Sequence, residues 1–316
     1  MNRALLVGID HYKKSPLNGC INDARGMNDT LCRNDDDSPN FDCMLMTSDK
    51  DTIDKYSLLE KVRKLFSAQA DLALLYFSGH GYDNKLGGLL VTQESERNIE
   101  GINLDDVLHI ANEADRINQI FIILDCCHSG HMGNPPMSNG YSAYLRKNIS
   151  ILTSSQEDEL SYEINGNGLF THSILNGLSG GAADVLGRVT AAGLYNYVDS
   201  MLGPWQQRPV FKSHVNQMLP IRKCKPMVPF TLIRKLTTYF PQKDYQFSLD
   251  PSYEPDAKPK HEEHEAILGE LQTCTRAGLV RPVGEKHMYY AAMNSKGCEL
   301  TPQGRMYWEM VDKGRL

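Results

Sequence analysis

Two apolar runs in this chain each stop abruptly at a small, polar and reactive cluster, and this pairing constrains the fold more than any other feature. Residues 72–77 lead into Ser78-Gly79-His80-Gly81, and residues 120–124 lead into Asp125-Cys126-Cys127-His128-Ser129-Gly130. Runs that are apolar on both faces are typical of buried parallel strands. Open α/β sheets place ligands and chemistry at the carboxyl ends of such strands. The sequence therefore predicts a histidine and a cysteine at neighbouring strand ends, the material of a Cys-His nucleophilic pair.

Strand-like runs alternate with helical patterns through the first two thirds of the chain. The strand candidates are 4–9, 43–47, 71–77, 119–124, 149–153 and 208–211, and the helix candidates are 20–32, 54–69, 103–113, 169–178 and 189–201. This alternation predicts an α/β domain with a mostly parallel six-stranded sheet and helices on both faces. A small hairpin is expected at residues 87–91, after the histidine loop.

The composition divides the chain into three parts. Residues 1–220 form the predicted α/β domain, 221–260 are rich in proline and predict a linker, and 261–316 predict a small α+β module. In that module a helix ends before Gly278, and another begins at Thr301-Pro302. Residues 288–293 between them alternate like a strand. Helix, two-stranded wing and helix resemble a winged helix.

Charge and cysteine content limit the classes of function. The net charge is −6, and residues 1–220 hold 18 Lys and Arg against 27 Asp and Glu. An acidic first domain argues against general nucleic-acid binding and suits basic peptide substrates. The eight cysteines have no disulfide-framework spacing and read as free thiols in a reducing compartment. No apolar run approaches 18 residues and no signal-peptide pattern is present, so we expect a cytoplasmic protein without a membrane partner.

Two other interpretations of Cys127 stand beside the nucleophile. It could be a buried structural thiol, since free cysteine is among the most buried residue types. A zinc site could use Cys126, Cys127, His128 and His131, but neighbouring side chains at a strand end point to opposite faces and share one tetrahedral ion poorly. Because the histidine motif coincides with the cysteine motif, the sequence favours the nucleophile.

The two motifs resemble those of caspase-like cysteine peptidases, in particular metacaspases and bacterial caspase homologues. The family motif Asp-x-Cys-His-Ser-Gly places the nucleophile at Cys127 and leaves Cys126 at a variable position. The resemblance implies that His80 moves the proton and that the amides of Gly81 and Cys127 form the oxyanion hole. The resemblance extends to three later segments, residues 149–155, 168–171 and 208–210. It therefore covers roughly residues 1–220, and it implies the caspase-hemoglobinase fold. For His80, a satisfied loop histidine is the other interpretation.

The same resemblance implies a specificity pocket for the substrate residue before the scissile bond. In metacaspases the positions that match Asp23, Ser78 and Asp125 line this pocket. Two carboxylates in a partly dry pocket demand a cation, which Arg or Lys supplies. The arginine of the animal caspase motif Gln-Ala-Cys-Arg-Gly is absent here. Asp23 belongs to the cluster Cys20-Ile21-Asn22-Asp23-Ala24. The other interpretation of this cluster is a helix N-terminus that Asn22 or Asp23 caps.

No cofactor is predicted, and calcium is the one metal for which the sequence offers candidates. Asp105 and Asp106 resemble paired aspartates that bind calcium in many metacaspases. Ser95 and Asn134 stand near positions where further aspartates would be expected. Two carboxylates do not complete a site that needs 6–8 oxygens. The sequence therefore favours the other interpretation, an acidic first helical turn stabilised by the helix dipole.

The sequence thus predicts a cysteine endopeptidase that cleaves after Arg or Lys, and analogy with bacterial homologues suggests an effector in defence or cell death. The alternative is a regulatory or scaffold protein, DNA-binding or not, with a degenerate protease-like domain. The C-terminal module has no basic recognition helix, which argues against strong DNA affinity. Its apolar residues Met288, Tyr289 and Tyr290 suit a protein partner. Self-cleavage near Arg146 or Lys147 is a further hypothesis, and a solvated basic pair that flanks a strand is the other interpretation of these two residues.

Overall fold

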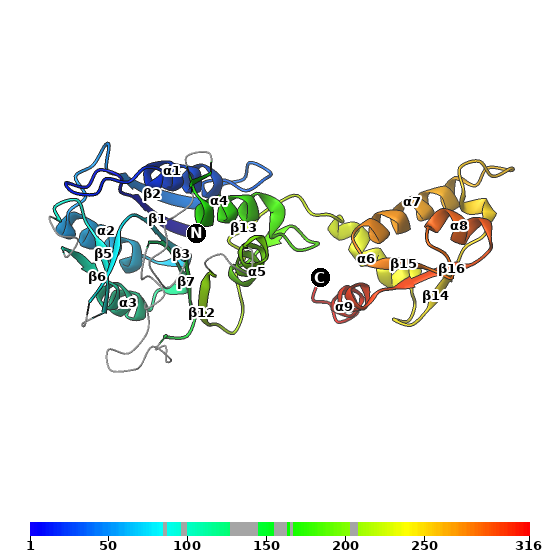
Figure 1. The fold of residues 1–316 in the computed structure, drawn as a ribbon. Helices are drawn as coiled ribbons and strands as arrows, with labels where there is room; N and C mark the ends of the chain where they lie inside the picture. Colours follow the sequence, from blue (N-terminus) through cyan, green and yellow to red (C-terminus); the bar gives the residue numbers. More distant parts are fainter. Residues whose placement is uncertain (85–86, 96–99, 127–144, 155–162, 165–166, 203–207) are drawn as a thin grey trace. The chain divides into compact units, whose positions relative to one another are not determined.

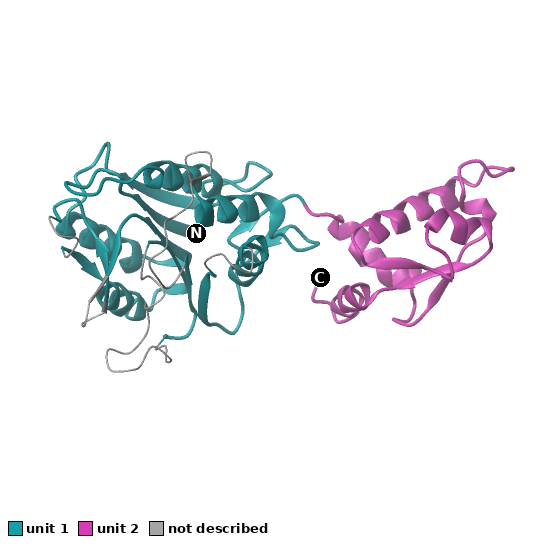
Figure 2. Ribbon diagram, viewed as in Figure 1, with its two compact units in different colours: residues 1–225 teal, residues 226–316 magenta. Residues whose placement is uncertain are grey.

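The computed structural model describes residues 1–84, 87–95, 100–126, 145–154, 163–164, 167–202 and 208–316 (Figure 1). The chain divides into two compact units, Met1–Lys225 and Pro226–Leu316 (Figure 2). Within the described ranges, no helix has both the length and the apolar character needed to cross a bilayer.

Unit 1 is built on a six-stranded sheet with the order β12-β8-β7-β3-β1-β2 (Figure 1). Its strands are β1 (Asn2–Gly8), β2 (Phe41–Thr47), β3 (Ala70–Ser78), β7 (Ile117–Asp125), β8 (Ile149–Thr153) and β12 (Val210–His214). All neighbours pair in parallel except β12, which runs antiparallel to β8. Each strand overlaps a run that the sequence predicted as a strand, so the predicted α/β architecture is confirmed.

Helices cover both faces of this sheet. They are α1 (Cys20–Leu31), α2 (Lys55–Ser67), α3 (Leu104–Asn112), α4 (Leu169–Asn176) and α5 (Ala191–Met201). One core packs α2 and α3 against the sheet, and the other packs α1, α4 and α5. Because successive side chains of a strand point to opposite faces, β3 supplies both cores, with Leu75 and Phe77 in the first and Leu74 and Tyr76 in the second. This double burial explains why the strand runs are continuously apolar.

Short antiparallel sheets complete unit 1. The predicted hairpin is confirmed as part of a sheet of β4 (Gly81–Asn84), β5 (Gly87–Val91) and β6 (Gly101–Asn103). The other pairs are β9 (Glu163–Ile164) with β10 (Asn167–Gly168) and β11 (Arg188–Val189) with β13 (Arg222–Lys223). A short π-helix, η2 (Gly177–Gly181), follows α4 directly.

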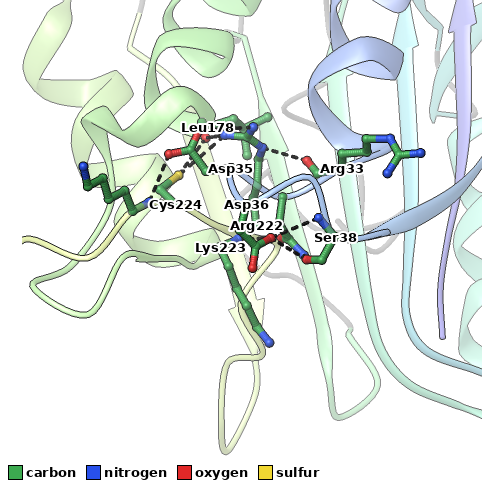
Figure 3. A network of polar contacts seen from close by, with 10 residues as sticks. Arg33, Asp35, Asp36, Ser38, Leu178, Arg222, Lys223 and Cys224 are labelled. Carbon is green, nitrogen blue, oxygen red and sulfur yellow. Dashed lines mark hydrogen bonds and ion pairs between the residues drawn. The ribbon is translucent and has the colours of Figure 1, made fainter. Parts of the chain in front are cut away.

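A polar network ties the end of unit 1 to the loop after α1 (Figure 3). The guanidinium of Arg222 is the centre of this network. It donates to the carbonyl oxygens of Leu178 (2.9 Å) and Arg33 (3.1 Å) and lies 3.8 Å from the carboxylate of Asp35. The same carboxylate accepts the backbone N–H of Lys225 at 3.1 Å. Because these contacts extend past residue 220, the compact unit ends later than the sequence predicted.

Unit 2 is an α+β unit around the three-stranded antiparallel sheet β14-β16-β15. Its elements are α6 (Phe230–Tyr239), β14 (Gln246–Ser248), η3 (Pro251–Tyr253), α7 (Glu262–Arg276), β15 (Val280–Val283), α8 (Met288–Met293), β16 (Gly297–Leu300) and α9 (Pro302–Asp312). As predicted, Gly278 follows α7 with a positive φ of 70°, and the Thr301 hydroxyl caps α9 by accepting the Gly304 N–H at 3.0 Å.

Two expectations for this part of the chain are wrong. Residues 288–293 form helix α8 and not a wing strand, because Met288 and Ala292 are buried while Tyr289 and Tyr290 are exposed, a spacing that suits a helix. The range 221–260, predicted as a linker, holds β13, α6, β14 and η3. Its prolines are compatible with these elements, since Pro229 directly precedes α6 and Pro251 is the first residue of η3.

Candidate active site

The strands that lead into the two motifs end side by side at the carboxyl edge of the sheet. Strands β3 and β7 are paired to their last residues, with Ser78 opposite Asp125. Just beyond, the Gly79 N–H donates to the Asp125 carbonyl oxygen at 3.3 Å. The register therefore brings His80, one residue later, to the strand end that leads to the cysteine motif, as the sequence predicted for a parallel pair.

Tyr12 supports the His80 loop from the segment after β1. The His80 backbone N–H donates to the Tyr12 hydroxyl at 2.9 Å, and that hydroxyl donates to the Val91 carbonyl oxygen at 3.3 Å. The two rings lie 4.6 Å apart. A Cβ on Gly79 would stand 2.5 Å from the Tyr12 hydroxyl, so glycine is needed for this close approach. Sequence reasoning missed Tyr12, which no motif marks.

A backbone carbonyl fixes the imidazole of His80. Its Nε2 lies 2.7 Å from the carbonyl oxygen of Ser15. Because a carbonyl only accepts, Nε2 carries the proton in this pair, and in the neutral ring Nδ1 is left with a free lone pair. Ser15 has a φ of +56°, a left-handed conformation that non-glycine residues rarely adopt. The chain thus holds an unfavourable backbone conformation at the residue that orients the candidate base.

The first backbone N–H groups of helix α1 are bound by Asp10 and not by Asp23. The carboxylate of Asp10 accepts the backbone N–H groups of Cys20 at 2.9 Å and Ile21 at 3.2 Å. The interpretation in which Asn22 or Asp23 provides this cap is therefore wrong. Asp10 lies two residues past the end of β1 and ten residues before the helix, too far from it for a capping motif to be recognised in the sequence.

The three predicted pocket residues come together from three elements. The Ser78 hydroxyl on β3 donates to Asp23 Oδ2 on α1 at 3.1 Å, and the Gly168 N–H donates to Asp23 Oδ1 at 3.3 Å. A Cβ on Gly168 would stand 3.1 Å from Asp125 Oδ2 and 3.6 Å from Asp23 Oδ2. Both carboxylates therefore border the same small space beside Gly168.

The Thr171 hydroxyl contacts Asp125, and the Tyr76 hydroxyl contacts Thr171. The Thr171 hydroxyl on α4 donates to Asp125 Oδ2 at 2.7 Å, and the Tyr76 hydroxyl on β3 lies 2.6 Å from Thr171 Oγ1. The sequence placed Gly168 and Thr171 in a family-like segment without a role. Only the packing of α4 against β3 and β7 brings them to the carboxylates.

The two acidic residues of the predicted pocket, Asp23 and Asp125, both have raised pKa values. Burial and the neighbouring Asp125 raise the pKa of Asp23 to about 8, against the lowering effect of the Ser78 hydroxyl and the Gly168 amide. Burial also raises the pKa of Asp125, against the Thr171 and Ser154 hydroxyls, which lower it. In the described part of the chain no Lys or Arg pairs with either carboxylate. The arrangement favours a cation supplied from outside.

The predicted nucleophile, Cys127, lies outside the described residues, as do His128, His131 and Asn134. Its neighbour Cys126 is buried, with 5% of its surface exposed, and its carbonyl oxygen accepts the Ser154 hydroxyl at 3.4 Å. Gly81, predicted for the oxyanion hole, begins β4 and pairs with Leu90.

The calcium candidates sit at the start of α3. Asp106 Oδ2 accepts from the Asn103 side chain at 3.2 Å, and the Ser95 hydroxyl donates to Glu100 at 2.6 Å. Burial and the Asp106 charge raise the pKa of Asp105. Among the described residues no three His, Cys, Asp or Glu side chains are grouped to hold a metal. The observed position is that of an acidic first helical turn.

The predicted self-cleavage segment is anchored at one of its two residues. The Arg146 guanidinium donates to the carbonyl oxygens of Asn112 and Ala114, both at 3.1 Å, at the end of α3. The Arg146 N–H also donates to the Asn112 side chain at 3.2 Å. Lys147 is exposed.

Comparisons with known proteins bear on the family and the fold of the chain. The family model described as the caspase domain matches residues 1–220. Caspase-1 from Spodoptera frugiperda superposes with a TM-score of 0.51 and 13% identity, covering 71% of this chain and 90% of its own. A structural-genomics target protein from Geobacter sulfurreducens gives a TM-score of 0.52 and 16% identity, covering 71% of this chain and 99% of its own. At these identities the structures support the fold alone. No curated protein sequence matches the chain.

Proposed function

Because the chain belongs to the caspase domain family, we propose that it is a metacaspase-type cysteine endopeptidase that cleaves after Arg or Lys. The observation that carries the specificity is a pair of carboxylates, the buried Asp23 and the half-buried Asp125, that border one space and lack a cation among the described residues. A guanidinium or ammonium group entering this space would supply the missing charge.

The proposed chemistry assigns each proton. His80 Nδ1 accepts the proton of the Cys127 thiol, and the thiolate Sγ bonds to the scissile carbonyl carbon. The C–N bond then breaks as the imidazolium returns the proton to the leaving amine. Water, deprotonated by the same nitrogen, hydrolyses the thioester. The Ser15 carbonyl supports this proposal, because its bond to Nε2 at 2.7 Å stabilises the imidazolium and holds the ring. The amides of Gly81 and Cys127 would hold the oxyanion.

Fluorogenic peptides that differ only in the residue before the scissile bond test the proposal. Arg and Lys peptides should be cleaved, whereas the Asp peptide and the neutral Arg isostere citrulline should lose roughly 100-fold or more in kcat/KM, as for a desolvated charge pair. Cys127→Ala should abolish hydrolysis. Cys126→Ala is the matched control and should keep most of it.

Preferred cleavage of the Asp peptide would contradict the proposed specificity. Equal loss of activity in Cys126→Ala and Cys127→Ala, with both proteins folded, would contradict the choice of nucleophile. No cleavage of any peptide, alone or after limited proteolysis of the chain, would favour the alternative of a regulatory or scaffold protein.

We propose that unit 2 binds a protein partner that controls this activity. Helix α8 leaves Tyr289, Tyr290 and Met293 between 43% and 50% exposed while Met288 and Ala291 anchor it to the unit. Exposed aromatic and methionine side chains are typical of protein-binding surfaces. The winged-helix likeness, a cytoplasmic location and a role in bacterial defence stay expectations drawn from the sequence.

A further inference from the structure

Two buried hydroxyl groups lie in contact beside the acidic pocket. Tyr76 on β3 and Thr171 on α4 are both fully buried, and their oxygen atoms are 2.6 Å apart. A buried hydroxyl without a partner is costly, so each must be satisfied locally. Neither group belongs to the chemistry proposed above.

The Thr171–Asp125 hydrogen bond determines which hydroxyl donates in the Tyr76–Thr171 contact. Thr171 Oγ1 lies 2.7 Å from Asp125 Oδ2, and an ionised carboxylate only accepts hydrogen bonds. The threonine hydroxyl has a single hydrogen, which it gives to Asp125. The Tyr76 hydroxyl must therefore donate to Thr171, and the two groups form an ordered chain of donors that ends on the Asp125 carboxylate.

The two pocket carboxylates are held differently. Asp23 receives one hydroxyl, from Ser78, and one amide, from Gly168, at 3.1 and 3.3 Å. Asp125 receives a shorter bond from the Thr171 hydroxyl, which is itself polarised by a second donor, and the Ser154 hydroxyl and the Thr171 backbone N–H also donate to it. The titratable groups near Asp125 are Asp10, Cys20, Asp23 and Tyr76. None of these is a cation that could neutralise the Asp125 carboxylate.

We propose that Tyr76 and Thr171 are positioning residues, a hydroxyl relay that keeps Asp125 ionised and aimed at the cationic side chain of the substrate. This inference rests on the proposed function, since it names the residues that prepare its specificity pocket. The relay gives the pocket one lasting negative charge even when Asp23 is protonated. Removing it weakens recognition of the cation and leaves the bond-breaking step intact.

Thr171→Val removes the hydroxyl at nearly constant shape, and Thr171→Ser keeps it. For the Arg peptide, Thr171→Val should raise KM about tenfold, the loss expected for one hydrogen bond to a charged group, with kcat within about twofold. Thr171→Ser should restore KM to within about twofold of wild type. The citrulline peptide should show no such change in KM. Calorimetric binding of the Arg peptide to the same variants in a Cys127→Ala background should weaken by the same factor.

Equal KM values for Thr171→Val and Thr171→Ser, or an equal rise for the Arg and citrulline peptides, would overturn the relay. If Thr171→Val does not fold by circular dichroism, Tyr76→Phe decides, because it removes the first donor and keeps the Thr171–Asp125 bond. A roughly threefold rise in the KM of Tyr76→Phe for the Arg peptide, with no rise for the citrulline peptide, supports the relay. An unchanged KM for the Arg peptide overturns it. If the Cys127→Ala protein binds no basic peptide at all, the proposed function fails, and that outcome is distinct from failure of the relay.

Discussion

Replacing Asp23 with asparagine should make the stability of unit 1 less sensitive to pH. Asp23 is 2% exposed and shares its pocket with Asp125. Asparagine has the same shape and mimics the protonated acid. Its Oδ1 can still accept the Gly168 N–H, and its Nδ2 can donate to the Ser78 hydroxyl, so both contacts of the carboxyl group survive.

The sign and size follow from the pKa of Asp23, which burial and the Asp125 charge raise from 3.8 to about 8. Below about pH 4, Asp23 is protonated in both the folded and the unfolded chain and the pKa difference has no effect on stability. As pH rises from about 4 to about 8, the unfolded chain loses the proton first, so the free energy of unfolding falls. At 1.36 kcal/mol for each pKa unit, this amounts to about 6 kcal/mol at full ionisation.

The measurement is guanidinium denaturation followed by circular dichroism at pH 5, 7 and 9, in a Cys127→Ala background that prevents self-digestion. The Asp23→Asn protein should gain stability relative to its parent as pH rises, with the largest gain at pH 9. Asp29→Asn, an exposed position on the same helix, controls for the loss of one surface charge and should show a much smaller trend.

A stability difference between Asp23→Asn and its parent that stays constant from pH 5 to 9 would refute this reasoning. It would mean that Asp23 ionises in the folded chain much as it does in the unfolded one. A difference that shrinks as pH rises would also refute it, because the sign would then be that of a carboxylate stabilised by a buried cation.

Two further predictions concern the pocket and the loop after the nucleophile. Gly168→Ala should fold, since φ is −62° there, yet its Cβ would stand 3.1 Å from Asp125 Oδ2, so kcat/KM for the Arg peptide should fall about tenfold. Gly269→Ala, which has open space around it, is the matched control, and equal kinetics for the two variants would contradict the pocket. Self-cleavage after Arg146 or Lys147 should be slow in the wild type, because α3 holds Arg146. It should be several-fold faster in Asn112→Ala, which removes the side-chain oxygen that accepts the Arg146 backbone N–H. Intact-mass analysis beside Cys127→Ala checks this, and a single uncut species in every sample would contradict self-cleavage.

Much of the fold could be predicted because its signals are local. The strands of the main sheet are short apolar runs bounded by polar or glycine-containing turns, and the helices between them have amphipathic spacing. Unit 2 was predicted less well. The tyrosines and methionines of α8 alternate loosely enough to suggest a strand, and six residues are too few for helical periodicity to decide.

The candidate site divides in the same way. Neighbouring strand ends implied that His80 would approach the cysteine motif, and the family resemblance indicated Asp23, Ser78 and Asp125. No pattern pointed to Tyr12, because its role depends on a contact with a backbone group 68 residues away.

The sequence by itself determined the order of strands and helices along the chain. It also determined which reactive side chains stand at the edge of the sheet, since both features depend on runs of neighbouring residues. Tertiary structure alone decided which groups hold and orient those side chains. Asp10 rather than Asp23 caps α1, the Ser15 carbonyl orients His80, and Thr171 reaches Asp125 from α4. Each of these contacts joins residues that are distant in the chain, and a hydrogen bond depends on distance and direction in space, which packing of the sheet and helices sets.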